Sequence, residues 1–407
     1  MSKLDELIQR FCPDGVDFKP LGEVCSFQKG NSLSKSDKGL GSIPIILYGE
    51  LYTTYGNYIT QIVSSTSEGR VKAATIAYKN NILLPISSTT KEAQIGKASV
   101  LCVDYPVYIG GDAIILKHEQ CAGFLVHLLN SSWFESLKMK CVHGTTIMHL
   151  HPKELMRVKI PIPPLEVQHE IVRILDSFTE LTAELTAELT ARKKQYEYYR
   201  DELLKQESAP RMRLSQIATA MYRGAGIKRN DVTETGTPCV RYGEIYTSYD
   251  IAFSECKSHT NPEVVASPKY FEHGDILFVI TGESVEDIAK SIAYIGYDKC
   301  LAGGDIVVMK HQQNPRYLSY ALSTTDARSQ KSKSKVKSKV VHSSVPSLQE
   351  IEIPIPPLAE QERIADLLDK FHALCNDIST GLPAEIEARK KQYEYYRDKL
   401  LTFKEVG

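Results

Sequence analysis

Five lysines occupy every second position between residues 331 and 339, separated by serine and valine. Side chains alternate between the two faces of an extended segment, so all five ammonium groups would point to the same side. Such a comb can contact the phosphates of a nucleic acid. The absence of acidic neighbours favours this role over that of a solvated loop. The comb consists of Lys331, Lys333, Lys335, Lys337 and Lys339.

Other basic residues follow the early β-branched runs of each half of the chain. Arg223, Arg229 and Arg241 are candidates for reading bases, because one guanidinium can donate two hydrogen bonds to a guanine. The remaining candidates for nucleic-acid contact are Lys29, Lys35, Lys38, Lys138, Lys140 and Lys228.

The sequence offers no convincing catalytic constellation. Residues 314–317 read Asn-Pro-Arg-Tyr, which resembles the NPPY element of amino-methyltransferases. Arginine replaces the second proline, however, and no glycine loop for S-adenosylmethionine stands upstream, so a plain turn is predicted. His149 and His151 lie two residues apart without a further ligand set, which predicts no metal site. We therefore expect no catalytic residue and no cofactor bound by this chain.

A block of tyrosines and basic residues occurs twice. Residues 191–204 and 388–401 are identical except at Glu202 and Lys399. Interleaved basic and aromatic residues occur both in nucleic-acid stacking and in protein interfaces. Two identical partners would need two identical docking surfaces, so the near-identity favours an interface. The predicted partner-binding residues are Arg192, Lys193, Tyr196, Tyr199, Arg389, Lys390, Tyr393 and Tyr396.

These candidates belong to a chain that is written twice. The hexapeptide IPIPPL at residues 160–165 returns at 353–358, and YGELYTTY at 48–55 returns as YGEIYTSY at 242–249. Each half begins with short β-branched runs between turn residues and then changes to helical periodicity. We predict an α+β fold with a pseudo-two-fold internal repeat. Two strand-rich, mixed α/β domains, 1–160 and 206–353, are each followed by a helical region, 161–205 and 354–407.

The helical regions must position the two domains. Ile171, Ile174, Phe178 and Leu181 recur at spacings of three and four residues. This narrow apolar seam favours a coiled coil of two long antiparallel helices over a helix packed on its own domain. The first helix is expected to run unbroken from about residue 165 to residue 204. The second should be broken near Gly381, where glycine and proline interrupt the pattern.

Two segments, IPIPPLEVQHEIVRIL and IPIPPLAEQERIADLL, resemble the conserved-region signature of type I restriction-modification specificity subunits. Val167 departs from the glutamate found at the matching position 360. The order of domain, helix, domain and helix is also similar to that family. The resemblance implies that each strand-rich domain is a target-recognition domain that reads one half of a bipartite, asymmetric site in double-stranded DNA.

The resemblance also implies the partners. The helices would set the spacing and dock two methyltransferase subunits for adenine methylation. Motor-nuclease subunits would complete a complex that restricts unmodified DNA. S-adenosylmethionine, ATP and magnesium are expected in these partners, and this chain is expected to be their non-catalytic subunit. Residues 182–190, TAELTAELT, resemble the spacer tetrapeptides of one subgroup. A further unit is expected to lengthen the gap between the half-sites.

Composition agrees with this hypothesis without proving it. The net charge of −1 hides recognition domains of +3 and +1 and helical regions of −3 and −2, so phosphate neutralisation is expected to be shared with the partners. The apolar runs are too short to span a bilayer. Nine scattered cysteines indicate reduced thiols and a cytoplasmic protein. A self-contained DNA methyltransferase or nuclease, and a coiled-coil scaffold without a DNA role, are the alternatives.

Overall fold

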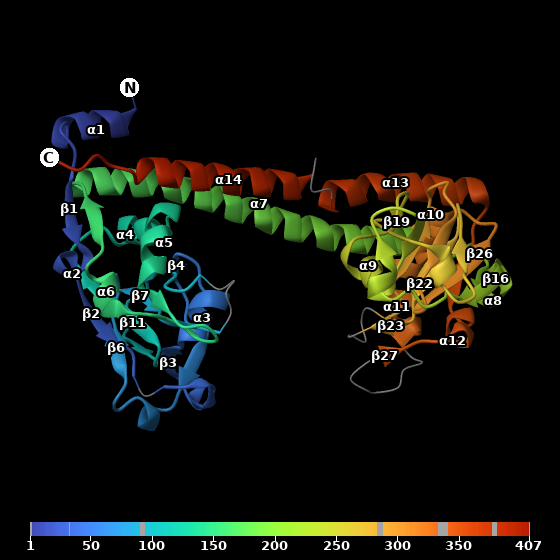
Figure 1. The fold of residues 1–407 in the computed structure, drawn as a ribbon, viewed down its shortest axis with the longest axis horizontal. Coiled ribbons are helices and arrows are strands. Elements are labelled where there is room, and N and C mark those ends of the chain that lie inside the picture. Colours follow the sequence, from blue (N-terminus) through green and yellow to red (C-terminus); the bar gives the residue numbers. More distant parts are fainter. Residues whose placement is uncertain are drawn as a thin grey trace. The chain divides into compact units, whose positions relative to one another are not determined.

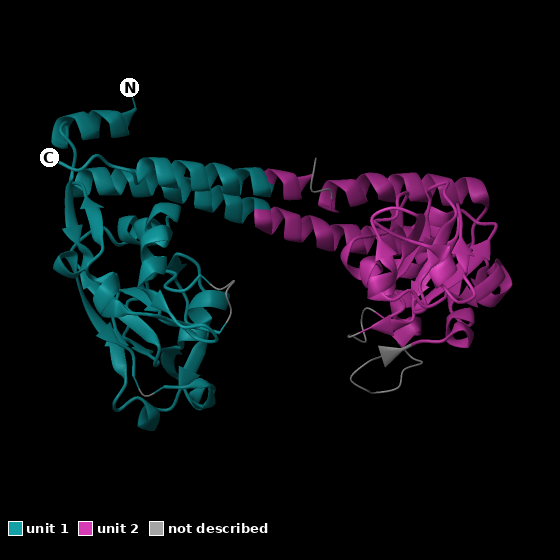
Figure 2. Cartoon of the chain, in the orientation of Figure 1, with its two compact units in different colours: residues 1–185, 386–407 teal, residues 186–385 magenta. Residues whose placement is uncertain are grey.

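In a computed structural model, the chain folds into two compact units. Unit 1 comprises residues 1–185 and 386–407, and unit 2 comprises residues 186–385 (Figure 2). The structure describes residues 2–31, 33–89, 94–282, 288–332, 341–376 and 381–406. The sequence predicts four consecutive segments instead. The difference arises because each helical segment buries its apolar stripe against a neighbouring strand-rich domain.

Unit 1 contains a five-stranded sheet of order β2-β11-β7-β9-β4 and a four-stranded sheet of order β5-β3-β10-β6. A three-stranded sheet, β12-β13-β8, and the ribbon β1-β14 complete it. The strands are β1 (Asp17–Pro20), β2 (Cys25–Lys29), β3 (Ile43–Ile46), β4 (Tyr58–Ile59), β5 (Ser64–Thr66), β6 (Thr75–Ala77), β7 (Ile82–Pro85), β8 (Ser87–Ser88), β9 (Ser99–Leu101), β10 (Val107–Ile109), β11 (Ala113–His118), β12 (Val142–His143), β13 (Met148–Leu150) and β14 (Lys159–Ile162).

Unit 2 repeats this topology. Its sheet β16-β26-β22-β24-β19 follows the order of the first sheet strand for strand, and β20-β18-β25-β21 follows the second, with β17 added at the edge. The strands are β15 (Arg211–Arg213), β16 (Ala218–Arg223), β17 (Val232–Thr233), β18 (Thr237–Val240), β19 (Ala252–Phe253), β20 (Ser258–Thr260), β21 (Tyr270–Phe271), β22 (Ile276–Val279), β23 (Thr281–Gly282), β24 (Ser291–Tyr294), β25 (Cys300–Ala302), β26 (Ile306–His311), β27 (Val341–His342) and β28 (Glu352–Pro354).

The helices follow the same duplication. Unit 1 has α1 (Lys3–Phe11), α2 (Leu21–Val24), α3 (Tyr48–Thr53), α4 (Ala122–Leu129), α5 (Ser132–Lys138) and α6 (Pro152–Leu155). Unit 2 has α8 (Leu214–Ile217), α9 (Tyr242–Thr247), α10 (Pro315–Ser323), α11 (Thr325–Ser332), α12 (Val345–Gln349) and α13 (Leu358–Asn376). Helix α7 (Leu165–Lys205) contributes to both units, and α14 (Leu382–Leu400) lies almost wholly in unit 1. Short 3-10 turns η1 (Lys35–Asp37) and η4 (Arg229–Asp231) precede β3 and β17.

Strand β7, at the centre of the sheet β2-β11-β7-β9-β4, is buried at every position. Its alternating side chains serve two cores, as strand geometry requires. Ile82 and Leu84 pack with Phe124 of α4 on one face, whereas Leu83 packs with Ile46 and Ile115 on the other. Strand β22 is likewise buried throughout. The continuous apolar runs of these strands are therefore explained by burial on both faces.

Helix α7 is unbroken over 41 residues. In unit 1, Ile171 and Leu175 are buried in the core that contains α4. Beside α7 lies α14 (Figure 1), where the rings of Phe178 and Tyr396 stack with their centroids 5.3 Å apart. The helix-pairing prediction is thus confirmed in unit 1, although the same stripe also packs on its own domain.

Unit 2 pairs the second half of α7 with α13. The Tyr196 and His372 rings lie 5.8 Å apart, and Leu204 shares a core with Leu368. Residue numbers rise along α7 as they fall along its partner, so the two helices run antiparallel. Helix α13 ends at Asn376 and α14 begins at Leu382, on either side of Gly381. Residues 377–380 lie outside the described part of the chain. None of the described helices is long and apolar enough to cross a membrane.

Candidate nucleic-acid interface

In unit 2, the three predicted base-reading arginines line one groove. The end of β16, the start of α9 and the turn before β26 enclose a cavity of about 880 Å³. Its lining includes Arg223, Arg229 and Arg241, together with Tyr242 and Asp305. The sequence grouped these arginines only by chemistry, and the fold brings them to one place.

Carboxylates hold two of the three guanidinium groups in position. The Arg223 Nη2 atom lies 2.6 Å from Asp305 Oδ1, and its Nε donates to the Gly304 carbonyl. The Arg241 Nη2 atom lies 3.0 Å from Glu244 Oε1. Glu244 in turn accepts hydrogen bonds from the Arg241 amide and the Ser258 hydroxyl. Arg223 keeps 60% of its side-chain surface exposed, so it is oriented by the protein and still accessible to a ligand.

Glycine lets two segments cross at the base of the groove. A Cβ atom on Gly224 would lie 2.2 Å from the Gly303 carbonyl oxygen, a distance that real side chains do not tolerate. In unit 1, a Cβ atom on Gly30 would lie 2.0 Å from the Gly110 carbonyl oxygen. The repeat therefore preserves the close backbone approach that shapes this region.

Unit 1 keeps the same framework and changes the cations. The ion pair between Lys29 and Asp112, at 3.4 Å, occupies the place of Arg223 and Asp305. Glu50, the counterpart of Glu244, is buried and binds Lys38 at 2.9 Å. The counterpart of Arg241 is Leu47, which is buried. Two different half-sites would require this combination of one shared backbone framework and different exposed side chains.

Three of the remaining basic candidates are exposed to solvent. Lys35 in η1, Lys140, and Lys228 beside Arg229 are exposed. Lys333, Lys335, Lys337 and Lys339 lie outside the described residues, so their place in a comb stays a prediction.

Lys331 and Lys138 correct the sequence-based assignment. The Lys331 ammonium is buried in unit 2 and donates to the Leu322 carbonyl at 2.8 Å and the Ser291 hydroxyl at 3.1 Å. Burial lowers the pKa of Lys331 to about 7. Lys138 is likewise buried in unit 1, beside Glu135 and the Gly96 carbonyl. Neither ammonium can reach a phosphate outside, because each lies in the interior of its unit.

Two tyrosines assigned to partner binding also lie within their units. Tyr196 is buried against His372 and Arg200 in unit 2, and the Tyr393 hydroxyl lies 2.8 Å from His127 Nδ1 in unit 1. Tyr396 is half-buried on Phe178. The outward part of the repeated block keeps Tyr199 exposed, with Arg192, Lys193 and Lys390; Arg389 is half-buried. Tyr198 and Tyr395, which the prediction omitted, are exposed as well.

The residues considered for catalysis and metal binding have local roles. The Asn314 side chain accepts the Tyr317 amide and caps α10, which begins at Pro315. A helix start therefore stands where the sequence predicts a plain turn. His149 Nδ1 lies 2.9 Å from the Ser87 hydroxyl and does not join His151. Tyr242 lines the groove, and the sequence analysis did not identify it. Its position in the repeated YGE motif, where it matches Tyr48, is the signal that could have identified it.

The chain thus consists of two strand-rich domains with the same framework and with basic side chains at equivalent positions. Residues 13–192 and 211–388 both match the type I restriction modification DNA specificity domain. The chain therefore belongs to the family of type I restriction-modification specificity subunits.

Individual relatives support this family assignment. The Escherichia coli type I restriction enzyme EcoR124I/EcoR124II specificity subunit is 35% identical over 60% of this chain and 63% of its own length. The match thus spans less than two thirds of that relative. A Haemophilus influenzae type I specificity subunit is 32% identical over 69% of this chain and 72% of its own. A chain from a solved type I R-M system has the same fold, with a TM-score of 0.67, 16% identity and coverage of 96% and 98%.

Proposed function

We propose that this chain is the DNA-sequence-recognition subunit of a type I restriction-modification complex. Each unit reads one half of a bipartite, asymmetric site in double-stranded DNA. The observation that carries the proposal is the duplicated framework around Glu50 and Glu244, which presents different cations in the two units.

The basic side chains of the two units suit DNA. Arg223, Arg229 and Arg241 offer guanidinium donors for guanine in the major groove, and Lys29 and Lys38 offer ammonium groups for phosphates. Asp305 and Glu244 hold the first and third arginines before DNA arrives, which reduces the ordering cost of binding. Lys35, Lys140 and Lys228 add exposed positive charge.

The helices are the spacing element in this proposal. A helix of 41 residues extends about 60 Å at ~1.5 Å per residue. Its tandem TAEL tetrapeptides each account for about 6 Å, which is a little under two base pairs at ~3.4 Å each. The number of tetrapeptides would set the length of the unread gap.

The same helices would dock two methyltransferase subunits through the exposed part of the repeated tyrosine block. Tyr198 and Tyr395 each keep 62% of their surface exposed, and exposed tyrosine beside arginine and lysine is typical of protein interfaces. Motor-nuclease subunits would join this assembly in the cytoplasm. S-adenosylmethionine, ATP and magnesium would be bound by the partners, so that this chain supplies recognition and no catalysis.

The test measures methyl transfer by the chain and its partner separately and together. We expect transfer from labelled S-adenosylmethionine to DNA only when methyltransferase subunits and this chain are combined. Gel shifts should show that the assembled complex prefers DNA from its own genome's modified sites over shuffled DNA. Transfer by the isolated chain would favour a self-contained enzyme. Equal binding to both DNAs would favour a scaffold without a recognition role.

A further inference from the structure

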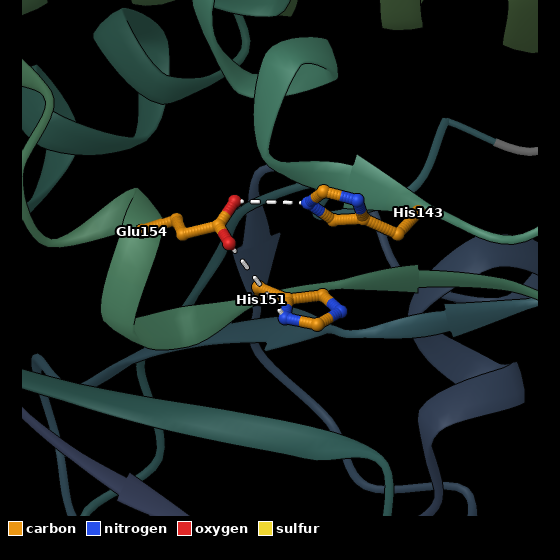
Figure 3. Close-up of side chains that lie close together, drawn as sticks. All are labelled: His143, His151 and Glu154. Carbon is orange, nitrogen blue, oxygen red and sulfur yellow. Dashed lines mark hydrogen bonds and ion pairs between the residues drawn. The ribbon is translucent and has the colours of Figure 1, made fainter.

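Two histidines and a glutamate converge on the surface of unit 1. His143, His151 and Glu154 each present one ligand-type atom, and these atoms all lie within 4.8 Å of one another (Figure 3). His143 Nε2 lies 3.0 Å from Glu154 Oε2, and His151 Nδ1 lies 3.9 Å from Glu154 Oε1. The two imidazole rings are 4.4 Å apart between centroids.

Backbone contacts bring these residues together from different elements. His143 ends β12, His151 follows β13, and Glu154 lies in α6. The His151 amide donates to the Cys141 carbonyl at 2.9 Å, which fixes the chain beside β12. At Gly144 the backbone has φ +112°, and a Cβ there would lie 2.1 Å from the Ile147 carbonyl oxygen. Glycine thus permits the tight hairpin that turns His143 toward α6.

The spacing of the three groups suits a transition-metal ion. Two ligand atoms that are each about 2.1 Å from a tetrahedral Zn²⁺ lie ~3.4 Å from each other. The separations of 3.0 Å from His143 to Glu154 Oε2 and of 3.9 Å from His151 to Glu154 Oε1 fall on either side of this value. All three side chains are partly exposed, so a water molecule can occupy a fourth position. Imidazole and carboxylate together favour zinc and its neighbours over magnesium or calcium.

Unit 2 does not repeat the ligand set. The positions that match His151 and Glu154 are Ser344 and Ser347, whose hydroxyl oxygens lie 2.8 Å apart at the start of α12. The fold therefore forms without these ligands, and their convergence in unit 1 is not a requirement of the repeated architecture. This difference separates the histidine-glutamate cluster from the features that the family fold itself demands.

We propose that His143, His151 and Glu154 form a site for a divalent transition-metal ion, best matched by Zn²⁺, which ties the β12–β13 hairpin to α6. The proposal does not depend on the function proposed above. The bound ion would cross-link two elements that are otherwise joined by short backbone contacts, and it would stabilise unit 1 by binding the folded state alone.

The test uses the full-length chain, stripped of metal with a chelator and titrated with Zn²⁺ and with Co²⁺. We expect one ion to bind through this site, with a rise in the unfolding temperature and with the visible absorption of tetrahedral Co²⁺. His143→Ala and His151→Ala should weaken binding at least ~10-fold, since loss of a direct ligand costs no less than loss of an outer-shell partner. Glu154→Gln should weaken it as well.

The matched control is His169→Ala, which removes an exposed histidine of α7 in the same unit. It should bind Zn²⁺ as the unaltered chain does. Failure of the unaltered chain to bind either ion would overturn the proposal. So would equal binding by the His143→Ala, His151→Ala and control variants. Thiolate-to-cobalt charge-transfer absorption would assign the ion to cysteines instead and would also overturn it.

Discussion

Both repeats have a buried lysine at the same position, Lys138 in unit 1 and Lys331 in unit 2, but the neighbouring charged residues differ. Lys138 of unit 1 forms an ion pair with Glu135 at 2.5 Å. In unit 2 the position of that glutamate is taken by Arg328, whose positive charge adds to burial in lowering the pKa of Lys331. A buried ammonium without a carboxylate partner is costly to the folded state, so Lys331 makes the stability of unit 2 depend on pH.

The sign of that dependence follows from proton linkage. The pKa of Lys331 is about 7 in the folded chain, against 10.5 as the ordinary value. Between these values the unfolded state binds one more proton, so this residue makes the free energy of unfolding rise with pH. In Lys331→Met this contribution is absent. The stability of the variant relative to the unaltered chain should therefore be greatest below about pH 7 and shrink toward pH 10.

Thermal unfolding across this pH range measures the difference, and Lys140→Met, at an exposed lysine of unit 1, is the control. A difference between Lys331→Met and the unaltered chain that stays constant with pH would contradict the buried ammonium.

Lys29 and Arg223 allow a second prediction for single residues. They stand at equivalent positions, each held by an aspartate. Lys29 is proposed to contact a phosphate, so Lys29→Ala should weaken binding of the assembled complex to specific and unrelated DNA alike and reduce the salt slope by about 1. Arg223 is proposed to read a guanine, so Arg223→Ala should cost about 1–3 kcal/mol on specific DNA and relax the sequence preference at one position. Exposed Lys79, paired with Asp104 outside the groove, supplies the control. An unchanged salt slope for Lys29→Ala would argue against phosphate contact, and an unchanged sequence preference for Arg223→Ala would argue against base reading.

Sequence chemistry identified some of these residues and misjudged others for a physical reason. The residue type of Arg223 and Arg241 predicts base reading, and both line the groove. The spacing of Lys331 to the later lysines predicts an exposed side chain. Whether a side chain points outward or into the core depends, however, on the tertiary packing, which the spacing does not reveal. Lys331 lies within helix α11, whereas the comb requires an extended segment.

At the scale of elements, the glutamine of the repeated signature fastens each long helix to its domain. Gln168 donates to the Pro163 carbonyl at 2.7 Å and accepts the Cys121 amide at 3.0 Å. Gln361 does the same with the Pro356 carbonyl, at 2.8 Å, and the Asn314 amide, at 2.9 Å. Both glutamines are fully buried, so each links the start of its helix to the start of α4 or α10.

Gln168→Ala should therefore destabilise unit 1 locally. The change leaves a buried carbonyl and amide without their partner, and each such group costs about 1–3 kcal/mol. Hydrogen–deuterium exchange should become faster in α4, while α10 keeps its protection; Gln361→Ala should show the reverse. His169→Ala, one residue further along α7, is the control. Faster exchange in both helices with either variant would mean that the two signatures do not act locally.

The TAEL segment gives a prediction about spacing. One additional TAEL after Leu189 extends a helix that is already continuous through this region. The extra length of about 6 Å should lengthen the gap of the methylated sequence by about two base pairs and leave both half-sites unchanged. The same-length variant Glu184→Gln should keep the original gap. An unchanged gap in the insertion variant would contradict the role of α7 as the spacing element.

The elements themselves were largely accessible from the sequence. The IPIPPL motif, the 3.6-residue periodicity and the glycine–proline interruption indicate where α7, α13 and α14 begin or end. The periodicity does not reveal that the apolar stripe of α7 packs on its own domain as well as on the neighbouring helix. Ile171 and Leu175 are buried against their own domain, because a stripe wide enough for a coiled coil can also contact a sheet-bearing domain.

At the scale of the whole molecule, segments that are far apart in the chain complete each unit. Residues 386–407 fold with unit 1, where Val16 bonds to Lys404 and the Ser132 amide donates to Asp398. In unit 2 the Thr325 amide donates to Asp201 in the same way. The repeat predicts two similar domains. It does not predict which helix completes which domain, because that choice depends on three-dimensional proximity rather than on sequence order.

The central claim is that each unit specifies one half of the recognised DNA. The most direct measurement is a genome-wide map of adenine methylation made by the complex with either the unaltered chain or Arg241→Ala. We predict a bipartite motif with a fixed gap, and relaxed bases in one half only for the variant, because unit 1 has Leu47 at that position. Changes in both halves, or a motif without a gap, would contradict the claim.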